Sequence, residues 1–437
     1  MPAGLDIRLR VPTPGLLGLP WADRLADWDA TEVPLRDIAV GPSRHLVRFV
    51  ESDGGLWALK ELPPRIAQKE FGVLRELESR GLAAVRPAGV VGQAFADTAI
   101  LVTRFLQPSW QYRRLLMRLP PGAGKNVHRS RLLDAMGALL VDLHRNGVFW
   151  GDCSLANTLF SRDGQRLQAW MVDAETSEVH PRLSNGQRQM DLDIVVDNVA
   201  GGLIDVAARL GEAPSDYGTY LFEATSVVTR YQALWDIQHE EPLLPYAERY
   251  RVEGQIRRLN DLGFAVEEVQ LESSRDGDDS LRLKVTVGGR RFHAEQLRRL
   301  TGLDVGEGQA TDLLNDLRAF QRRLEQSGAV ATDAVVARRW LTEVFEPGMA
   351  RAHAAIGGVG DPIQAYADLL EVRWLLSERA GRDVGDEPAL VALAHREAPI
   401  ASAARMAVVE TPTGQLPAVA PVEGPPDSSP APSAWEL

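Results

Sequence analysis

The sequence predicts an α+β protein with two lobes, a small β-rich lobe followed by a helical one, and then an added, mainly helical C-terminal domain and a disordered tail. Three observations lead to this fold class. Short alternating apolar runs dominate from about residue 30 to 106, longer stripes of helical spacing follow to about 250, and helical patterns return up to about 401. A length of 437 residues is sufficient for two or three domains.

The composition is that of an ordinary globular protein, with 45% hydrophobic and 25% charged residues. A net charge of -12 argues against a surface built mainly to hold nucleic acid. The first twenty residues, interrupted by Asp6 and several prolines, do not have the pattern of a secretory signal, and no apolar stretch is long enough to span a membrane. The single cysteine, Cys153, excludes an intramolecular disulfide framework, so we expect a cytoplasmic protein.

Residues 30–106 are expected to form the β-rich lobe, preceded by an N-terminal extension at residues 1–29. Two alternating runs, HLVRFVES and LWALKEL, flank Asp53-Gly54-Gly55, which is a strong β-hairpin signal. The next segment, IAQKEFGVLRELESRG, changes to helical spacing and ends at Gly81. TAILVTRFL then returns to a strand pattern.

Residues 107–250 are expected to form the helical lobe. The segment RSRLLDAMGALLVDLHRNG carries one apolar stripe and leads into the loop NGVFWGDCSLANTLF. Two short strands, NTLF and LQAWMVDAE, follow and are joined around Asp163-Gly164. MDLDIVVDNVAGGLIDVAARLG is predicted to be a buried helix, and a further helix is expected near residues 217–240.

Residues 251–401 are predicted to form the C-terminal domain, whose small β element turns at Gly288-Gly289 into a helix. Large apolar residues at helical spacing are usually core, and four of them are predicted core anchors: Trp340, Phe345, Trp374 and Leu375. From about residue 402 to 437 the chain is rich in Pro, Ser and Ala, which predicts a disordered tail.

Five polar residues in the first two lobes match the needs of phosphoryl transfer. That chemistry requires a cation near the phosphates, oxygen ligands for Mg²⁺, and a carboxylate that orients the attacking hydroxyl. Lys60 ends the predicted strand WALK, and Glu70 follows on the next predicted helix, where an ion pair would hold the ammonium in place. Asp152 and Asn157 lie on one tight loop, and Asp173 ends the predicted strand AWMV.

This order of residues resembles the protein-kinase-like superfamily over roughly residues 30–250. The resemblance implies ATP and Mg²⁺ as cofactors. It implies that Lys60 contacts the nucleotide phosphates with Glu70 as its helix partner, and that Asp152 is the catalytic base. Asn157 and Asp173 would be the metal ligands.

The departures from the protein-kinase pattern are informative. Trp150-Gly151 stands where His-Arg would precede the catalytic Asp, Ser154 replaces a Lys, and Ala174-Glu175 follows the metal Asp. These features, and the Asp191-Leu192 pair expected at a helix start, are more similar to lipopolysaccharide (Kdo or heptose) kinase-like bacterial proteins of uncharacterised function. The segments WGDCSLANTLF, VDAET and RWLTEVFEP are also similar to that group.

The loop expected to cover the phosphates is atypical. VGPSRHLVRF contains one glycine, Gly41, so Ser43 and Arg44 are expected to supply part of the phosphate contacts, whereas His45 is expected to be a surface loop residue. Thr103, in the strand TAILVTRFL, is a further candidate for nucleotide binding.

Residues 110–131 contain six basic residues and no acidic one. Arg113, Arg114 and Arg118 are therefore candidates for holding an anionic acceptor, the alternative being a solvated helix face and loop. Cys153, beside Asp152, is more typical of packing than of redox chemistry.

The primary hypothesis is an ATP- and Mg²⁺-dependent phosphotransferase acting on a hydroxyl of a small or envelope-related, sugar-like molecule. Two alternatives stay open. One is a nucleotide-binding pseudokinase or scaffold whose C-terminal domain contacts a protein partner, and the other is an atypical protein kinase. Nucleic acid is not an expected partner, because acidic residues interleave the basic ones in residues 251–300 and no reader motif is complete.

Overall fold

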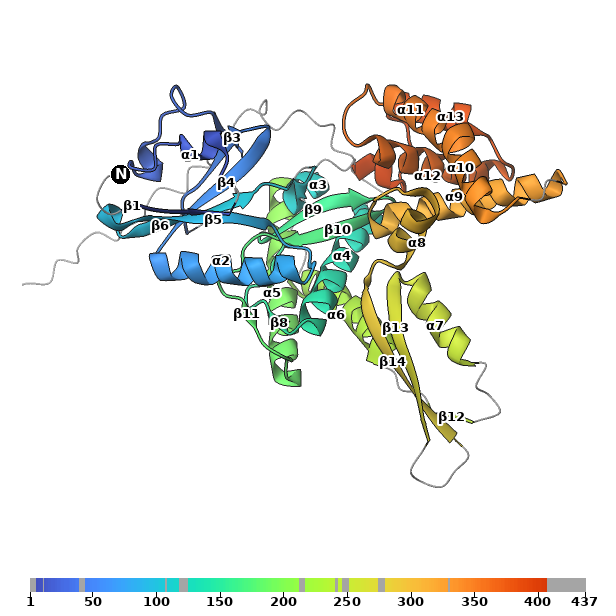
Figure 1. The fold of residues 1–437 in the computed structure, drawn as a ribbon, viewed down its shortest axis with the longest axis horizontal. Helices are drawn as coiled ribbons and strands as arrows, with labels where there is room; N and C mark the ends of the chain where they lie inside the picture. Colours follow the sequence, from blue (N-terminus) through green and yellow to red (C-terminus); the bar gives the residue numbers. More distant parts are fainter. Residues whose placement is uncertain are drawn as a thin grey trace, which may run out of the picture.

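The computed structural model describes residues 5–10, 12–38, 44–106, 108–117, 125–211, 217–239, 243–245, 251–273, 280–328 and 331–406. Three bodies follow one another along the chain: a sheet-rich lobe, a helical lobe, and a C-terminal domain from which a long β-ribbon projects (Figure 1). Among the described residues, no helix is both long and apolar enough to cross a membrane.

A six-stranded antiparallel sheet forms the first lobe, in the spatial order β1-β5-β6-β4-β3-β2. Its strands are β1 (Leu5–Leu9), β2 (Leu35–Arg36), β3 (Val47–Ser52), β4 (Gly55–Leu62), β5 (Arg86–Gln93) and β6 (Thr98–Arg104). The predicted hairpin is confirmed, since β3 and β4 are paired up to Ser52 and Gly55. Asp53 and Gly54 both have a positive φ, which a two-residue turn of this kind requires.

Helix α2 (Pro64–Ser79) covers one face of this sheet, as its helical spacing predicts. It begins with Pro64 at its first position, where the missing N–H has no intrahelical partner to lose. Its apolar side, with Leu74 and Leu77, is fully buried. Gly81 follows the helix with a φ of +67°, which explains the glycine at that position.

The N-terminal residues cover the opposite face. Strand β1 pairs with β5, and α1 (Pro14–Leu17) and the 3₁₀ turn η1 (Leu25–Asp27) cross above the sheet. Trp21 and Trp28 are buried there, edge to face at 5.3 Å between ring centroids. Residues expected to be an extension therefore supply a strand and part of the core of the β-rich lobe. The physical reason is that the sheet has two apolar faces and α2 covers only one of them.

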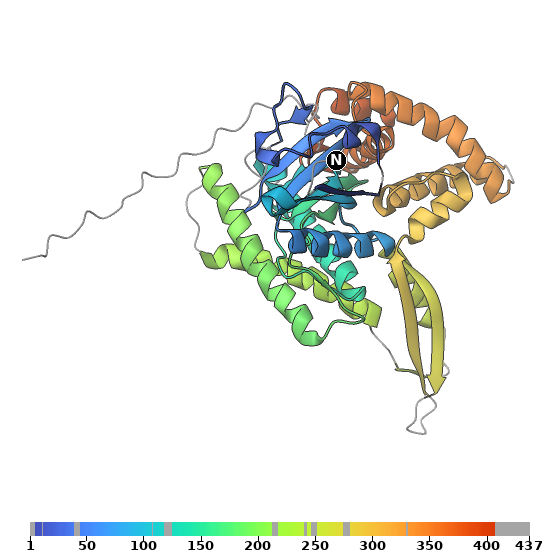
Figure 2. The same ribbon diagram turned by 60° about the vertical axis from the view of Figure 1, so that its left-hand side comes forward.

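The second lobe is built on three long helices and several short strands. The helices are α3 (Tyr112–Met117), α4 (Lys125–Arg145), α5 (Asn185–Arg209) and α6 (Tyr217–His239), and the strands are β7 (Trp110–Gln111), β8 (Val148–Phe149), β9 (Thr158–Asp163), β10 (Arg166–Met171) and β11 (Glu178–Val179). Figure 2 shows α5 and α6 side by side, away from the sheet. The predicted buried helix is confirmed as α5, but it begins at Asn185, capped by Ser184, rather than at Asp191.

The C-terminal domain combines a β-ribbon with a bundle of helices. Its elements are β12 (Leu243–Pro245), α7 (Arg251–Asp261), β13 (Phe264–Ser273), β14 (Ser280–Arg290), α8 (Phe292–Thr301), α9 (Glu307–Gln326), α10 (Asp333–Trp340), the π-helical turn η4 (Leu341–Phe345), α11 (Glu346–Ala355), α12 (Pro362–Ala380), α13 (Asp386–Ala394) and η5 (Ala403–Met406). The expected turn at Gly288-Gly289 is wrong, because β14 continues through both glycines to Arg290.

The helices α8 to α13 enclose a separate apolar core. Trp340 and Phe345 are buried in it, as predicted. Trp374 is not a core anchor, because 58% of its surface is exposed. Leu376, two residues later, still packs against this core, so Trp374 lies on the solvent-exposed side of α12.

Packing continues past the expected start of the tail. The hydroxyl of Ser402 is buried and donates to the carboxylate of Glu371, and the amide of Ala403 donates to the same group. These bonds hold the chain against α12 up to Met406. Residues 407–437, most of the expected tail, lie outside the described part of the chain.

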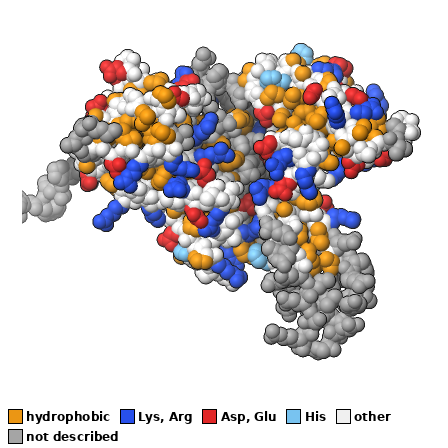
Figure 3. Space-filling model, viewed as in Figure 1, with side chains coloured by type: hydrophobic (Ala, Val, Ile, Leu, Met, Phe, Trp, Pro, Cys, Tyr) orange, Lys and Arg blue, Asp and Glu red, His pale blue; other side chains and the backbone are white. Residues whose placement is uncertain are grey.

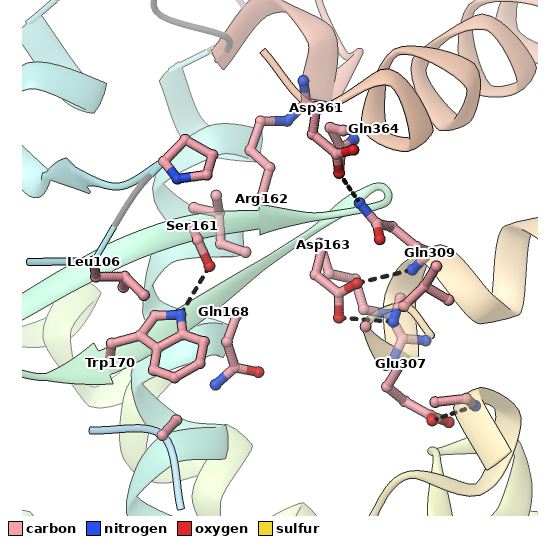
Figure 4. A pocket seen from close by; sticks show the side chains of 18 of the residues that line it. Leu106, Ser161, Arg162, Asp163, Gln168, Trp170, Glu307, Gln309, Asp361 and Gln364 are labelled. Carbon is pink, nitrogen blue, oxygen red and sulfur yellow. Dashed lines mark hydrogen bonds between the residues drawn. The ribbon is translucent and has the colours of Figure 1, made fainter. Parts of the chain in front are cut away.

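The tip of the β9–β10 hairpin joins the helical lobe to the C-terminal domain. Asp163 accepts hydrogen bonds from the amides of Gly308 at 2.8 Å and Gln309 at 2.9 Å, in the first turn of α9 (Figure 4). A carboxylate is favoured there because the first amides of a helix have no intrahelical acceptor. The hairpin is therefore attached to the C-terminal domain at its tip.

Candidate functional site

Lys60 lies at the centre of a cluster of three carboxylates. It is near the end of β4, inside the sheet, with neighbouring strands on both sides. Its ammonium is 3.1 Å from Glu70 Oε2, 2.9 Å from Asp173 Oδ2 and 3.7 Å from Glu175 Oε2. Burial works against the charge of Lys60, but Glu70 and Asp173 outweigh it, and the pKa of Lys60 is raised. The lysine is therefore a fixed cation.

Glu70 connects α2 to the segment that follows β10. Its side chain is almost completely buried and accepts a hydrogen bond from the amide of Ala174 at 3.2 Å, besides its ion pair with Lys60. Burial raises the pKa of Glu70 to about 7, against the opposing effect of Lys60 and with a further increase from Asp173. The position of α2 thus depends on a carboxylate that is costly to ionise without Lys60.

Asp152 and Asn157, five residues apart on the loop after β8, are in direct contact. The Asn157 amide nitrogen donates to Asp152 Oδ2 at 2.9 Å and to the Asp152 carbonyl at 3.2 Å. Asn198, on α5, donates to Asp152 Oδ1 at 3.4 Å and to the Cys153 carbonyl at 3.1 Å. The loop therefore closes on itself, and Asp152 is oriented by two amides.

Asp191 of α5 holds the start of the loop that carries Asp152, a role that the sequence did not suggest. Its fully buried carboxylate accepts hydrogen bonds from the amides of Trp150 and Gly151, both at 2.8 Å. The ring of His144, on α4, lies 3.0 Å from the same carboxylate and 3.0 Å from the hydroxyl of Tyr231 on α6. Three helices thus hold the residues that precede Asp152. The sequence carried no distinct signal for this role, because α5 contains three other aspartates, Asp193, Asp197 and Asp205, and burial distinguishes Asp191 from them.

Cys153 points into the core next to this loop. It is fully buried, and burial raises the pKa of its thiol well above the usual value, with Asp191 adding to the increase. A thiol with a raised pKa has little thiolate, so the geometry agrees with the predicted packing role.

The β9–β10 hairpin places Asn157 and Asp173 beside each other. Asn157 immediately precedes β9, Asp173 follows β10, and the amide of Val172 donates to the Asn157 carbonyl at 3.1 Å. Two residues separated by a whole hairpin are therefore neighbours because its strands are paired along their length.

The donor set at the base of the hairpin fits Mg²⁺. Because the Asn157 amide nitrogen is held by Asp152, its oxygen points away, and within the described chain this oxygen has no hydrogen-bond donor. Asp173 adds carboxylate oxygens. The described residues contain no group of three His, Cys, Asp or Glu side chains arranged for a metal. Magnesium in nucleotide sites commonly uses one or two protein oxygens and takes its other ligands from phosphates and water.

Glu175 and His45 form a bridge that the sequence analysis missed. Glu175 Oε2 lies 3.1 Å from His45 Nε2, which precedes β3, and the Glu175 amide donates to Asp173 Oδ1 at 3.0 Å. Because Glu175 also reaches Lys60, it joins the helical lobe to the sheet lobe. His45 is therefore a partly buried bridging residue rather than the surface loop residue expected from its position.

Of the remaining candidates for nucleotide contact, the structure places Thr103 on the same face of the sheet as Lys60, whereas the others are exposed or lie outside the described residues. Gly41 and Ser43 lie outside the described residues, and Arg44 is exposed. Thr103, on β6, is directly opposite Ala58 of β4, while Leu101 is opposite Lys60. Directly opposed residues share a face and alternate residues of a strand point the same way, so Thr103 and Lys60 lie on the same side of the sheet.

The basic segment at residues 110–131 is largely matched by acidic partners. Arg113 pairs with Asp205 on α5, and Arg114 also makes an interaction, while Arg118 lies outside the described residues. Farther along, Arg131 is 3.1 Å from Glu371. These pairs compensate the local excess of positive charge, which a sequence window cannot show because the acids come from distant helices.

Comparisons with known proteins match two separate segments of the chain to different families. Residues 55–198 match the lipopolysaccharide kinase (Kdo/WaaP) family, and residues 233–396 match a domain of unknown function, DUF4032. A search of the curated proteins found no significant match.

Two solved structures show the similarity at low levels of identity. One is described as WaaP in complex with acyl carrier protein, with 18% identity, a TM-score of 0.29, and coverage of 45% of this chain and 90% of that chain. The other is the BubR1 kinase domain, with 14% identity, a TM-score of 0.31, and coverage of 52% and 72%. Such scores add no functional argument.

The family match contains every residue of the cluster described above, from Lys60 to Asp173. The order and contacts of these residues, on a sheet lobe followed by a helical lobe, agree with it. The chain thus contains a region that matches the lipopolysaccharide kinase (Kdo/WaaP) family, followed by a region that matches a domain of unknown function.

Proposed function

We propose that this protein transfers the γ-phosphoryl group of ATP to a hydroxyl of a small or envelope-related, sugar-like molecule. The observation that carries this function is the position of Lys60, which is bound both to Glu70 of the sheet lobe and to Asp173 at the end of the β9–β10 hairpin. A cation fixed between two elements in this way can hold phosphates next to a metal ligand.

Each residue has a defined task in this reaction. Lys60 contacts the phosphates, and Glu70 keeps the ammonium in place. Asn157, through its oxygen, and Asp173 would hold Mg²⁺, which neutralises charge on the β- and γ-phosphates when it is bound. Asp152, oriented by two amides, accepts the proton of the attacking hydroxyl.

A small acceptor is favoured over a polypeptide by the segment after Asp173. Residues 174–184 span the entire distance to α5, and part of this segment is taken up by β11, which pairs with β8. Little chain is left for a platform that could hold an extended peptide. The description of the matching family, lipopolysaccharide kinase, supports a sugar-like hydroxyl in the same role.

One observation favours a pseudokinase instead. Glu175 lies 3.7 Å from Lys60 and is also bound to His45, so the phosphate-binding cation already has an internal carboxylate partner. If this bridge does not open, nucleotide would bind weakly and no phosphate would be transferred.

A single set of samples separates these functions. We would measure Mg²⁺-ATP binding by calorimetry and transfer of labelled phosphate to Kdo- and heptose-containing acceptors. Asp173→Asn is expected to weaken Mg²⁺-ATP binding at least about tenfold, since it removes a charged metal ligand. Asp152→Asn is expected to leave binding intact and to lower turnover by about 10²- to 10⁴-fold.

Asp193→Asn is the matched control, because Asp193 is exposed on α5 and, among the described residues, its side chain is hydrogen-bonded to Gln189 alone. It should behave as the wild type. Undiminished turnover in Asp152→Asn would contradict the assignment of the base, and binding of nucleotide without transfer to any acceptor would favour the pseudokinase. Labelling of the protein itself would favour an atypical protein kinase.

A further inference from the structure

A large cavity lies between the helical lobe and the C-terminal domain, away from the candidate kinase site. Its volume is about 1720 Å³, and its walls come from the β9–β10 hairpin, the end of α4, the β14–α8 and α8–α9 junctions, and the start of α12. Figure 3 shows basic and acidic side chains around the hollow between these two parts. Lys60, Asp152 and Asp173 are not among the lining residues, so the cavity is a separate site.

Several arginines that line this cavity have no acidic partner. Within the described part of the chain, five of them make no ion pair and no side-chain hydrogen bond: Arg86, Arg166, Arg290, Arg298 and Arg396. Four of these are exposed, where water is a sufficient partner: Arg86, Arg166, Arg298 and Arg396. Arg290 is different, because it is partly buried.

Arg290 has a buried donor that nothing in the described chain satisfies. Its Nε atom is inaccessible to solvent and without a hydrogen-bond partner. The guanidinium lies 5.8 Å from the centre of the Phe264 ring, and the guanidinium of Arg145 lies at the same distance from that ring. Two cations are thus held at one aromatic side chain. A buried, unsatisfied guanidinium nitrogen costs free energy that a ligand could recover.

Arg166 adds a further positive charge to the lining of the same cavity. Burial and the charge of Arg290 lower the pKa of Arg166, whereas Asp163 and Asp312 oppose that decrease. The Arg166 side chain is nevertheless accessible to solvent. Both properties follow from a position inside an open cavity, surrounded by protein but not in contact with an acid.

Three carboxylates of the same cavity already have partners. Asp163 accepts the two amides of α9, and Glu307 accepts the amides of His293 and Ala294 and lies against the His293 ring (Figure 4). Asp368 is paired with Arg162. Two other lining acids, Asp142 and Asp304, make no ion pair or side-chain hydrogen bond among the described residues. Asp142 and Asp163 influence Arg290 electrostatically, but neither comes within ion-pair distance of it.

We propose that this cavity binds a phosphate-bearing small molecule through Arg166 and Arg290. Two unpaired cations that line one cavity favour a ligand with at least two negative charges, and a guanidinium matches the oxygens of a phosphate in a bidentate manner. The cavity exceeds the roughly 300–1,000 Å³ of an ordinary small-molecule pocket. The ligand therefore fills only a part of it, and the arginines determine which part.

The wall beside these arginines suits the organic part of such a ligand. Trp170 of β10 and Leu106 face the cavity, with the Trp170 indole held by a 2.8 Å hydrogen bond to the hydroxyl of Ser161 (Figure 4). Because the indole donor is already satisfied, its ring offers an apolar face. A phosphate ester with a sugar or a base attached has both of the required parts, a dianion and a face that can stack.

The test is calorimetric titration of the full-length chain with inorganic pyrophosphate and with orthophosphate, in EDTA so that no metal-dependent binding contributes. Acetate serves as the monoanion. We expect saturable binding of both phosphates and none of acetate. Arg166→Gln and Arg290→Gln should each weaken binding about tenfold or more, since each removes a charge-assisted hydrogen bond. Arg290→Lys keeps the charge but loses the planar group, and should lie between.

Two controls locate the site. Arg322 is exposed on α9, also without a partner among the described residues, and Arg322→Gln should bind as the wild type does. Lys60→Met removes the cation of the nucleotide site and should also bind normally. Loss of binding in Lys60→Met alone would place the anion in the kinase-like cleft and overturn the cavity site. The absence of saturable phosphate binding, or unchanged affinity in both arginine variants with a native melting profile, would overturn it as well.

Discussion

Arg162, near the tip of the β9–β10 hairpin, forms a buried ion pair with Asp368 of α12, with 4% and 8% of the two side chains exposed. The pair connects the hairpin that carries both candidate metal ligands to the core of the C-terminal domain. The fold thus links the kinase-like site to the C-terminal domain through one rigid element.

Removing one partner of this pair should be strongly destabilising. Asp368→Ala leaves the Arg162 charge buried without compensation, and a loss of about 3–5 kcal/mol of unfolding free energy is expected, measured by urea denaturation. The double variant Arg162→Met with Asp368→Leu should recover most of the loss. Breaking the exposed pair Arg339–Glu343 by Glu343→Gln serves as the control and should have little effect. If Asp368→Ala and Glu343→Gln lowered the free energy of unfolding equally, the Arg162–Asp368 pair would have no special role in stability.

Asp312 should make stability depend on pH near neutrality. Burial raises its pKa from about 3.8 to about 7, and Glu371 and Asp163 add to the increase. Between these two values the folded protein holds a proton that the unfolded chain has lost, so this contribution to stability is present at low pH and is lost as the pH rises through 7.

Asp312→Asn should remove that dependence. The melting temperature of the variant relative to the wild type is expected to increase from pH 5 to pH 8. Scanning calorimetry at intervals of half a pH unit would measure it. A constant difference between the two proteins over that range would show that Asp312 has an ordinary pKa in the folded state.

Asp191 should act as a positioning residue for Asp152. Asp191→Asn keeps only one acceptor oxygen for the amides of Trp150 and Gly151, so the loop that carries Asp152 should lose its exact orientation. We expect phosphate transfer at saturating substrate to fall about tenfold or more, with Mg²⁺-ATP affinity changed less than about twofold, because misplacement affects the transition state more than ground-state binding. A parallel loss of affinity and turnover would indicate a purely structural role.

Glu175 should compete with phosphates for Lys60. Glu175→Gln removes a negative charge 3.7 Å from the ammonium, so ATP binding in EDTA is expected to strengthen about three- to tenfold. His45→Gln is the companion variant, because it weakens the same bridge without changing the charge near Lys60 when the histidine is neutral. Weaker nucleotide binding in Glu175→Gln would mean that this carboxylate assists the phosphates instead of blocking them.

Local patterns were sufficient for the secondary structure near the site. The Asp53-Gly54 turn fixed the β3–β4 hairpin, and the hydrophobic spacing of α2 identified the helix that carries Glu70, because turn chemistry and side-chain periodicity act over a few residues. Trp374 shows where this stops. Its spacing was that of a core residue, but its exposure depended on which side of α12 faces the neighbouring helices.

The sequence by itself determined the kinase-like order of Lys60, Glu70, Asp152, Asn157 and Asp173. Each of these residues lies in or next to a strand, helix or loop that a short stretch of sequence is enough to predict. Only the tertiary structure decided their partners. The support of Asp152 by Asp191, the contact of Glu175 with Lys60, and the compensation of Arg113 by Asp205 all join residues far apart in the chain. Such contacts depend on how helices and strands pack, and burial then sets the energy of each charge. Neither the contacts nor these energies can be predicted from a short stretch of sequence.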